Sequence, residues 1–267
     1  MKGFLMRVGI DTTNIGYCAP VFSDNHFEYI PIPQFNNETS ENLRYGTMKA
    51  RTHEGKFLSD FMHTDHHSYV DESGNPYVRS IDENGESLLA QDLTPHFDPE
   101  FTTNSFGDFW AQGRGRIPSE LRPEDCVFFY AGLSRCDPSF YECKRTWEEL
   151  KDFQVRNKCA FLVGFLKIEK IFDIRTEQDL LASREEIWNN AHFKETIVPT
   201  VILKGKNESK LLDKAIQLNY WQPEIGKYNP TDIGNKIGLV PMSGVRIMKW
   251  LDEPLCNEVA ETINNYH

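Results

Sequence analysis

The sequence predicts a mixed α/β fold, with a central mixed sheet flanked by helices and one long irregular segment. Two apolar runs, at residues 125–131 and 159–172, have the length and composition of buried strands. Two stretches, at 176–190 and 254–263, carry the start signals and apolar residues typical of helices. Turn-forming residues dominate 34–118, so we expect most of that segment to lack regular structure.

Further strands are predicted from shorter apolar runs. One covers residues 4–11, and another covers 196–203. A third, at 26–33, is expected at a sheet edge, because its prolines cannot donate to an interior ladder. Within the long run at 159–172, Gly164 indicates a bulge or a close backbone approach.

The clearest helix is predicted to begin at Thr176, where Asp179 stands at the spacing of a capping box, and to continue to about Asn190. Residues 210–217 are predicted to form a second helix, and 147–155 a short one. With 267 residues and 39% hydrophobic content, the chain can bury a substantial core. We expect one domain over 1–267.

Composition excludes several classes of protein. The formal net charge of −11 argues against broad electrostatic capture of DNA or RNA, which depends on many Lys and Arg contacts to phosphate. No apolar run approaches the roughly 20 residues that cross a bilayer, and residues 1–10 lack the features of a signal peptide. The expected compartment is the cytoplasm. The six cysteines include no C-x-x-C pair and are not expected to form disulfides.

One irregular stretch combines groups suited to acid–base chemistry and phosphate binding. His96 titrates near neutrality and can relay a proton, and Asp98 and Asp108 supply two carboxylates in the same stretch. Arg114 and Arg116 can bind a phosphate or a carboxylate through two hydrogen bonds each. Gly107 and Gly115 would let the backbone approach a ligand closely. The alternative is a structural loop in which the arginines pair with the two aspartates.

A second candidate group stands where the first predicted strand ends. Asp11 is followed by Thr12 and Asn14, and α/β proteins place ligand-binding groups at the carboxyl ends of strands. These side chains suit a ribose, a metal or a base edge; the alternative is an Asx-turn in which Asp11 caps local backbone. Trp110 lies in polar surroundings and is a candidate for stacking on a base.

No metal site or cofactor is predicted. The stretch His63-Thr-Asp-His-His67 has no glutamate after its first histidine, as a helical H-E-x-x-H zinc motif requires, and the adjacent His66 and His67 cannot easily converge on one ion. This stretch is therefore interpreted as a solvated loop. The phosphate-binding loops, the dinucleotide fingerprint, the nucleophile elbow and the zinc-deaminase signature are absent. The cofactor therefore stays unknown.

Taken in order, several motifs resemble the nucleotide modification associated domain family, third type. They are Arg7-Val-Gly-Ile-Asp11, Phe27-Glu-Tyr-Ile-Pro-Ile-Pro33, Leu58-Ser-Asp60, His96-Phe-Asp98-Pro-Glu-Phe101, Phe106-Gly-Asp108, Arg114-Gly-Arg116, Phe128-Phe-Tyr-Ala-Gly-Leu133 and Val163-Gly-Phe165. The resemblance implies nucleotides or nucleobases in DNA as the substrate class, with polar site positions at Asp11, His96, Asp98, Asp108, Arg114 and Arg116. Residues 62–92 are longer than the family pattern, as a variable insertion would be, and Phe106 stands where a tyrosine is expected.

The middle of the chain is similar to modified-base readers with PUA-like barrels, on the strength of a proline-acidic turn, a strand ending in Phe-Tyr and a later Leu-Val-Gly-Phe strand. Two functions follow. The chain either acts on a nucleotide or DNA base through His96, Asp98 and Asp11, or it is a non-catalytic reader or interaction subunit of a DNA-modification enzyme. Whether it is an enzyme is left open by the sequence.

Overall fold

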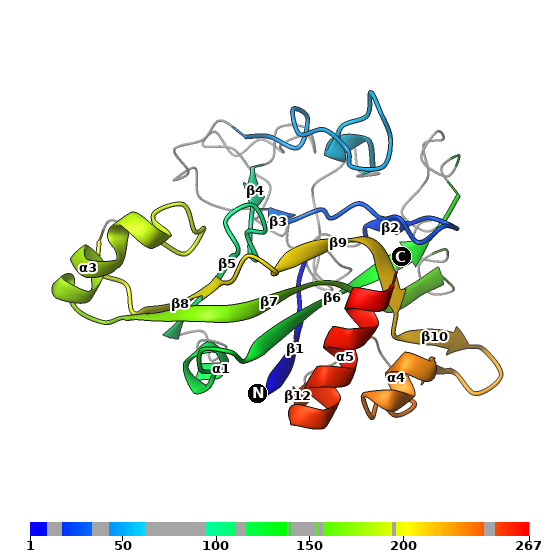
Figure 1. Cartoon of the computed structure of the whole chain (residues 1–267). Coiled ribbons are helices and arrows are strands. Elements are labelled where there is room, and N and C mark those ends of the chain that lie inside the picture. Colours follow the sequence, from blue (N-terminus) through cyan, green and yellow to red (C-terminus); the bar gives the residue numbers. More distant parts are fainter. Residues whose placement is uncertain are drawn as a thin grey trace, which may run out of the picture. The chain divides into compact units, whose positions relative to one another are not determined.

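Two long strands form the centre of the sheet, because most of their residues are apolar and buried (Figure 1). They are β6 (Cys126–Arg135) and β7 (Lys158–Ile174), and each extends beyond the apolar run that predicted it. The register between β7 and β9 (Lys210–Gln217) shifts at Gly164, where an added Cβ would lie 2.9 Å from the backbone oxygen of Lys210. The predicted bulge is thus confirmed.

The computed structural model describes residues 1–9, 18–33, 43–61, 94–110, 116–137, 139, 153, 157–193, 196–242 and 249–266. Their contacts define two units. The first comprises Met1–Val8, Phe97–Ala131 and Ala160–His267, and the second Gly9–His96 and Gly132–Cys159. The expected single domain stays a prediction, and the expected insertion at 62–92 lies outside the described residues.

In the first unit the strands follow the order β12-β1-β6-β7-β8-β5, with β9 paired to β7. β1 runs parallel to β6 and antiparallel to β12, so the sheet is mixed, as the sequence predicted. β8 runs antiparallel to both β7 and β5. The strands not yet given bounds are β1 (Gly3–Arg7), β5 (Ser105–Phe109), β8 (Thr200–Gly205) and β12 (Lys249–Leu251).

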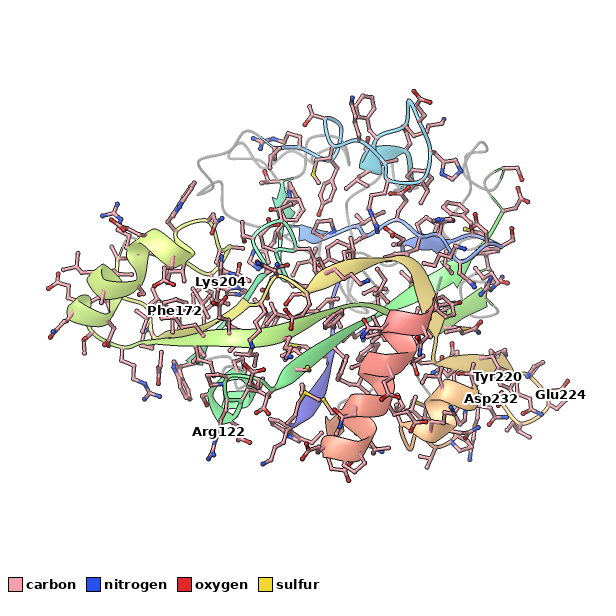
Figure 2. The ribbon with its side chains drawn as sticks, in the orientation of Figure 1. Arg122, Phe172, Lys204, Tyr220, Glu224 and Asp232 are labelled. Carbon is pink, nitrogen blue, oxygen red and sulfur yellow. The ribbon has the colours of Figure 1, made fainter. Side chains whose placement is uncertain are left out.

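The helix α3 (Glu177–Ile187) connects β7 to β8 and has the predicted capping box: Thr176 accepts from the backbone of Asp179, whose carboxylate accepts from the backbone N–H of Thr176. Its inner face packs on Phe172, which Figure 2 labels on β7 beneath the helix. Burying side chains of this size stabilises the fold by about 1.5–3 kcal/mol each. This core holds the turn that follows α3. It consists of Phe172, Ile174, Leu180, Ile187 and Ile202, with Phe193 packed against it.

The prediction for residues 210–217 is wrong, since they form β9 and not a helix. The apolar positions Leu211, Leu212, Ala215 and Ile216 recur at the spacing of a helix and do not alternate as in a strand. Pairing with β7, a long buried strand, supplies backbone hydrogen bonds and packing that local propensity does not include. Tertiary context therefore decided this element.

The remaining elements of the first unit lie near its carboxyl end or precede β6. α5 (Glu253–Asn265) is the predicted terminal helix, and Asp252 caps its first turn. The hairpin of β10 and β11 precedes α4; Figure 2 labels Tyr220 and Asp232 there. The bounds are α1 (Arg116–Glu120), β10 (Asn219–Gln222), β11 (Lys227–Pro230) and α4 (Asp232–Lys236).

The second unit has little regular structure among its described residues. β2 (Pro20–Val21) runs parallel to the last residues of β6, and β3 (Ile32–Pro33) pairs antiparallel with β4 (Pro95–His96). The predicted edge strand at 26–33 thus forms only in part. A short 3₁₀ helix, η1, covers Leu58–Phe61. The helix predicted at 147–155 falls almost wholly outside the described residues.

Three expectations concern the whole chain. The described strands form an open sheet, so the PUA-like barrel is not found in this part of the chain. None of the described helices has the length and apolar character needed to span a membrane. The described cysteines are buried and carry free thiols, as expected: Cys18, Cys126, Cys136, Cys159 and Cys256.

Candidate functional site

The candidate site is built on β5, which ends the path of the sheet in the first unit. Its backbone pairs with β8 from Ser105, opposite Lys204, to Phe109, opposite Thr200. Successive side chains of a strand point to opposite faces. Ser105, Gly107 and Phe109 therefore share one face of β5, and the residues between them face the other way.

The backbone of β5 holds the side chain of Asp98 in place. Its Oδ1 accepts a hydrogen bond from the N–H of Gly107 at 3.0 Å. Its other oxygen, Oδ2, lies 3.7 Å from Nδ1 of His192. Only 13% of the Asp98 side chain and 8% of the His192 side chain are exposed. The predicted residue Asp98 therefore belongs to a carboxylate–imidazole pair in which His192 is buried and Asp98 is mostly shielded from solvent; it is called the buried pair below.

The turn after α3 delivers His192 to this pair. The side chain of Asn190 accepts from the backbone N–H of His192 at 2.9 Å and donates to Oγ of Ser105 at 3.0 Å. The ring of Phe109 meets the imidazole edge to face, with 4.9 Å between centroids. Ser105, Phe109 and Asn190 thus orient His192 from two elements that are far apart in the sequence.

Gly107 is essential to the close packing of this turn. An added Cβ would lie 2.8 Å from Oδ1 of Asn190 and 3.1 Å from Cβ of His192. Such contacts are shorter than van der Waals separations, so any larger side chain would push the turn away. The sequence predicted that Gly107 allows a close approach to a ligand; what approaches it is the turn that holds His192.

Asp108 and Trp110 do not join the pair. Asp108 is buried and follows Gly107 on the strand, so its side chain points to the opposite face, and its Oδ1 accepts from the N–H of Phe109 at 2.8 Å. Trp110 donates through Nε1 to Asp173 at 3.0 Å, and the guanidinium of Arg175 lies 4.0 Å from the centre of its ring. One face of the indole is therefore occupied by Arg175.

Of the other predicted site residues, the structure describes His96 and the backbone of Arg116. His96 lies in β4, opposite Ile32 of β3, in the second unit. Arg116 begins α1, and its side chain is not described. The remaining four lie outside the described residues: Asp11, Thr12, Asn14 and Arg114.

His192 is the residue that the sequence analysis missed. It follows a helix end in the polar stretch Asn189-Asn-Ala-His192, and such stretches usually form solvated turns. No local spacing links it to Asp98, since the two residues meet only through the pairing of β5 with β8. The one available signal is a histidine directly after a capped amphipathic helix, which is too common to identify a site.

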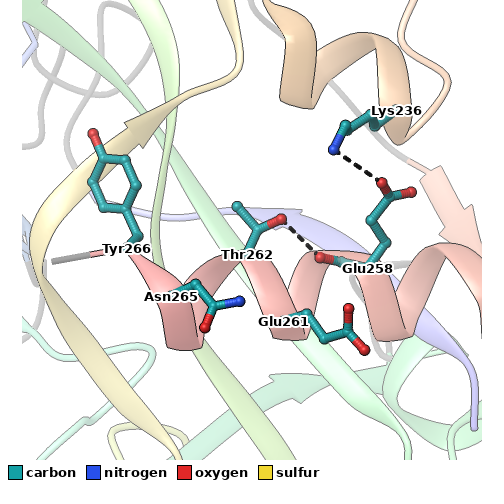
Figure 3. Close-up of a pocket in the computed structure, with 6 residues that line it drawn as sticks. All are labelled: Lys236, Glu258, Glu261, Thr262, Asn265 and Tyr266. Atoms are coloured by element: carbon teal, nitrogen blue, oxygen red, sulfur yellow. Dashed lines mark hydrogen bonds and ion pairs between the residues drawn. The ribbon is translucent and has the colours of Figure 1, made fainter.

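A hollow lies between α4 and α5, away from the predicted site residues (Figure 3). Its volume is about 360 Å³. Nζ of Lys236 pairs with Glu258 at 3.3 Å, and the hydroxyl of Thr262 donates to the backbone oxygen of Glu258 at 2.8 Å. The side chains of Lys236, Glu258 and Thr262 are thus bound within the protein, as on an ordinary helix–helix surface. The lining residues are Lys236, Glu258, Glu261, Thr262, Asn265 and Tyr266.

Comparison with known proteins gives one match. The family described as Nucleotide modification associated domain 3 matches residues 2–229, which include the whole of the Asp98–His192 site. The α4–α5 hollow lies beyond this match. No curated protein and no solved structure matches the chain.

Proposed function

The chain belongs to the Nucleotide modification associated domain 3 family, and we propose that it binds a nucleotide or nucleobase and acts on it at the Asp98–His192 pair. The family points to nucleotide modification, and the buried pair is the observation that carries the choice of site. Burying a carboxylate beside an imidazole is costly unless the groups are satisfied. Sites that pair two titratable groups in this way are often functional.

The geometry suits acid–base chemistry. A histidine in water titrates near pH 6.5, so it can accept and return a proton under physiological conditions. Asp98 is held by the N–H of Gly107, and the imidazole of His192 is held by the ring of Phe109. Groups that are oriented before the ligand arrives need little reorganisation during the reaction.

Other residues enter the proposal from the sequence. His96 stands two positions before Asp98, and two peptide steps of about 3.8 Å keep their Cα atoms within about 7.6 Å. It is proposed as a further proton carrier. The arginines are proposed to bind phosphate, and the strand-end group to bind ribose or a base edge. The arginines are Arg114 and Arg116. The strand-end group consists of Asp11, Thr12 and Asn14.

Trp110 is proposed to stack on a base, and Arg175 lies over one face of its ring. A base would stack on the face that Arg175 leaves uncovered. Asp108, which points away from the pair, is proposed to organise the backbone at Phe109 and not to touch the ligand.

The test is a thermal-shift panel of deoxynucleosides and their mono-, di- and triphosphates. A ligand present at 100 times its Kd stabilises the native state by about 2.7 kcal/mol, which raises Tm by roughly 5–10 °C for a chain of this length. In a modification assay with the bound nucleotide, His192→Ala should lower turnover by about 10²–10⁴-fold. His26→Ala, which removes an exposed histidine, is the matched control. If no member of the panel raises Tm, the proposal is wrong.

An interaction subunit is the second candidate, and α3 supplies the observation that favours it. Leu181 and Trp188 are 70% and 58% exposed and stand seven residues apart, so they lie on the same side of the helix. This function predicts a stable complex with a DNA-modification enzyme, weakened by Trp188→Ala, and no rise in Tm with any nucleotide.

A further inference from the structure

The separation between Asp98 and His192 is too long for a hydrogen bond. Their facing atoms, Oδ2 and Nδ1, are 3.7 Å apart, whereas hydrogen bonds from nitrogen to oxygen span about 2.7–3.2 Å. The chain also contains an exposed pair of the same two residue types. There Oδ2 of Asp24 and Nδ1 of His26 are 2.8 Å apart, which is a direct hydrogen bond.

The longer separation matches two ligands of one metal ion. Imidazole nitrogen and carboxylate oxygen bind Zn²⁺ at about 2.0–2.2 Å. Two such bonds of about 2.1 Å place their donor atoms 3.7 Å apart when the angle at the metal is roughly 120°. The distance between the two atoms therefore suits one ion bound by both.

The surrounding contacts are those of a supported metal site. The N–H of Gly107 holds Oδ1 of Asp98, so that Oδ2 is the oxygen that faces His192. Asn190 fixes the backbone of His192 through a buried carboxamide that is itself bound to Ser105. The hydrogen bond from Gly107 is of the kind that orients a metal-binding carboxylate, whereas Asn190 positions His192 through its backbone.

We infer that Asp98 and His192 bind a divalent transition-metal ion, of the class of Zn²⁺ or Mn²⁺. The imidazole favours Zn²⁺ over Mg²⁺ and Ca²⁺, which prefer oxygen donors alone, and the carboxylate is a ligand that also suits Mn²⁺. The inference deepens the proposed function and rests on the same site. Water, substrate or further side chains fill the remaining positions. The proton carrier then becomes a metal-bound water, whose pKa the ion lowers toward neutrality.

The experiment is calorimetric titration of the full-length chain, freed of metal by a chelator, with ZnCl₂ or MnCl₂ in buffer without nucleotide. One equivalent of ion should bind. Asp98→Asn keeps an oxygen for the N–H of Gly107, so the fold should persist while affinity falls by at least about 10-fold. His192→Ala should have a similar effect. Asp24→Asn and His26→Ala remove the exposed pair and should leave the affinity unchanged.

A second readout does not depend on the variants folding. Co²⁺ bound by an imidazole and a carboxylate gives visible absorption bands, which should appear at one equivalent in the wild-type chain and disappear when Zn²⁺ is added. No stoichiometric binding, or binding that survives in both Asp98→Asn and His192→Ala, would overturn the inference. A nucleotide-dependent rise in Tm that persists in metal-free protein would leave the proposed function standing without the metal. Metal binding with no nucleotide response would support the inference while the proposed function fails.

Discussion

Two Asp–His pairs among the described residues differ in sequence separation, in exposure and in the distance between their facing atoms. Asp24 and His26 are neighbours in sequence, are 60% and 42% exposed, and are joined by a hydrogen bond of 2.8 Å. Asp98 and His192 come from distant segments, are 13% and 8% exposed, and face each other at 3.7 Å. The exposed pair is close and the buried pair is separated, which is the reverse of what attraction alone would give.

The difference shows what fixes each distance. On the surface, two side chains near each other in sequence rotate freely until they meet, and water supplies their other hydrogen bonds. In the buried site, each residue is already bound elsewhere, Asp98 by the N–H of Gly107 and His192 through Asn190. The scaffold therefore sets the gap. A gap maintained at the cost of desolvating two polar groups indicates a function for the space between them.

The largest expected effect comes from breaking the scaffold of the buried pair. Gly107→Ala places a Cβ 2.8 Å from Oδ1 of Asn190, so the turn must shift. Overpacking of this kind costs about 1–3 kcal/mol of unfolding free energy, measurable by urea denaturation. His26→Ala is the control at the exposed pair. An unfolding free energy equal to that of the wild type would show that the turn is not tightly held.

A smaller effect is expected from loosening the helix that delivers His192. Thr176→Ala removes the N-cap of α3 and should lower the unfolding free energy by about 1 kcal/mol. Thr176→Ala should also weaken ligand binding at the buried pair, although Thr176 does not contact either residue of that pair. Thr262→Ala is the matched control, because that hydroxyl bonds to a carbonyl within α5 and caps nothing. If the unfolding free energy falls equally in Thr176→Ala and Thr262→Ala, the N-cap does not stabilise α3.

The smallest effect is expected at the exposed pair. A surface ion pair contributes about 0.2–1 kcal/mol, so Asp24→Asn should change stability by no more than this. The hydrogen bond from His26 lowers the pKa of Asp24 below its usual 3.8. A lowered folded pKa means that the contribution is present above the unfolded pKa and is lost as the pH falls through the folded pKa.

Urea denaturation of the wild type and Asp24→Asn at pH 6 and near pH 3 checks this sign. The difference between them should shrink on acidification. A difference that grows instead would mean that folding raises the pKa of Asp24. The Asp24–His26 pair could then no longer serve as the exposed reference for the buried pair.

Several elements could be predicted from sequence because their signals are local. The capping box at Thr176 and Asp179 and the apolar runs of β6 and β7 each depend on residues a few positions apart. Their outcome is decided by sterics and hydrogen bonds within one or two turns. The sequence marked Asp98 as a candidate site residue for a related reason, since it stands in a short stretch rich in polar and glycine residues.

Only the tertiary structure decided the rest. The segment 210–217 became β9 because β7 offered it a partner strand, against a helical reading of the same residues. His192 reached Asp98 because the turn after α3 packs against β5 at Gly107. Both events depend on contacts between residues far apart in the chain. The sequence by itself determined which residues can carry chemistry and where local structure begins; the pairing of strands determined which of those residues meet.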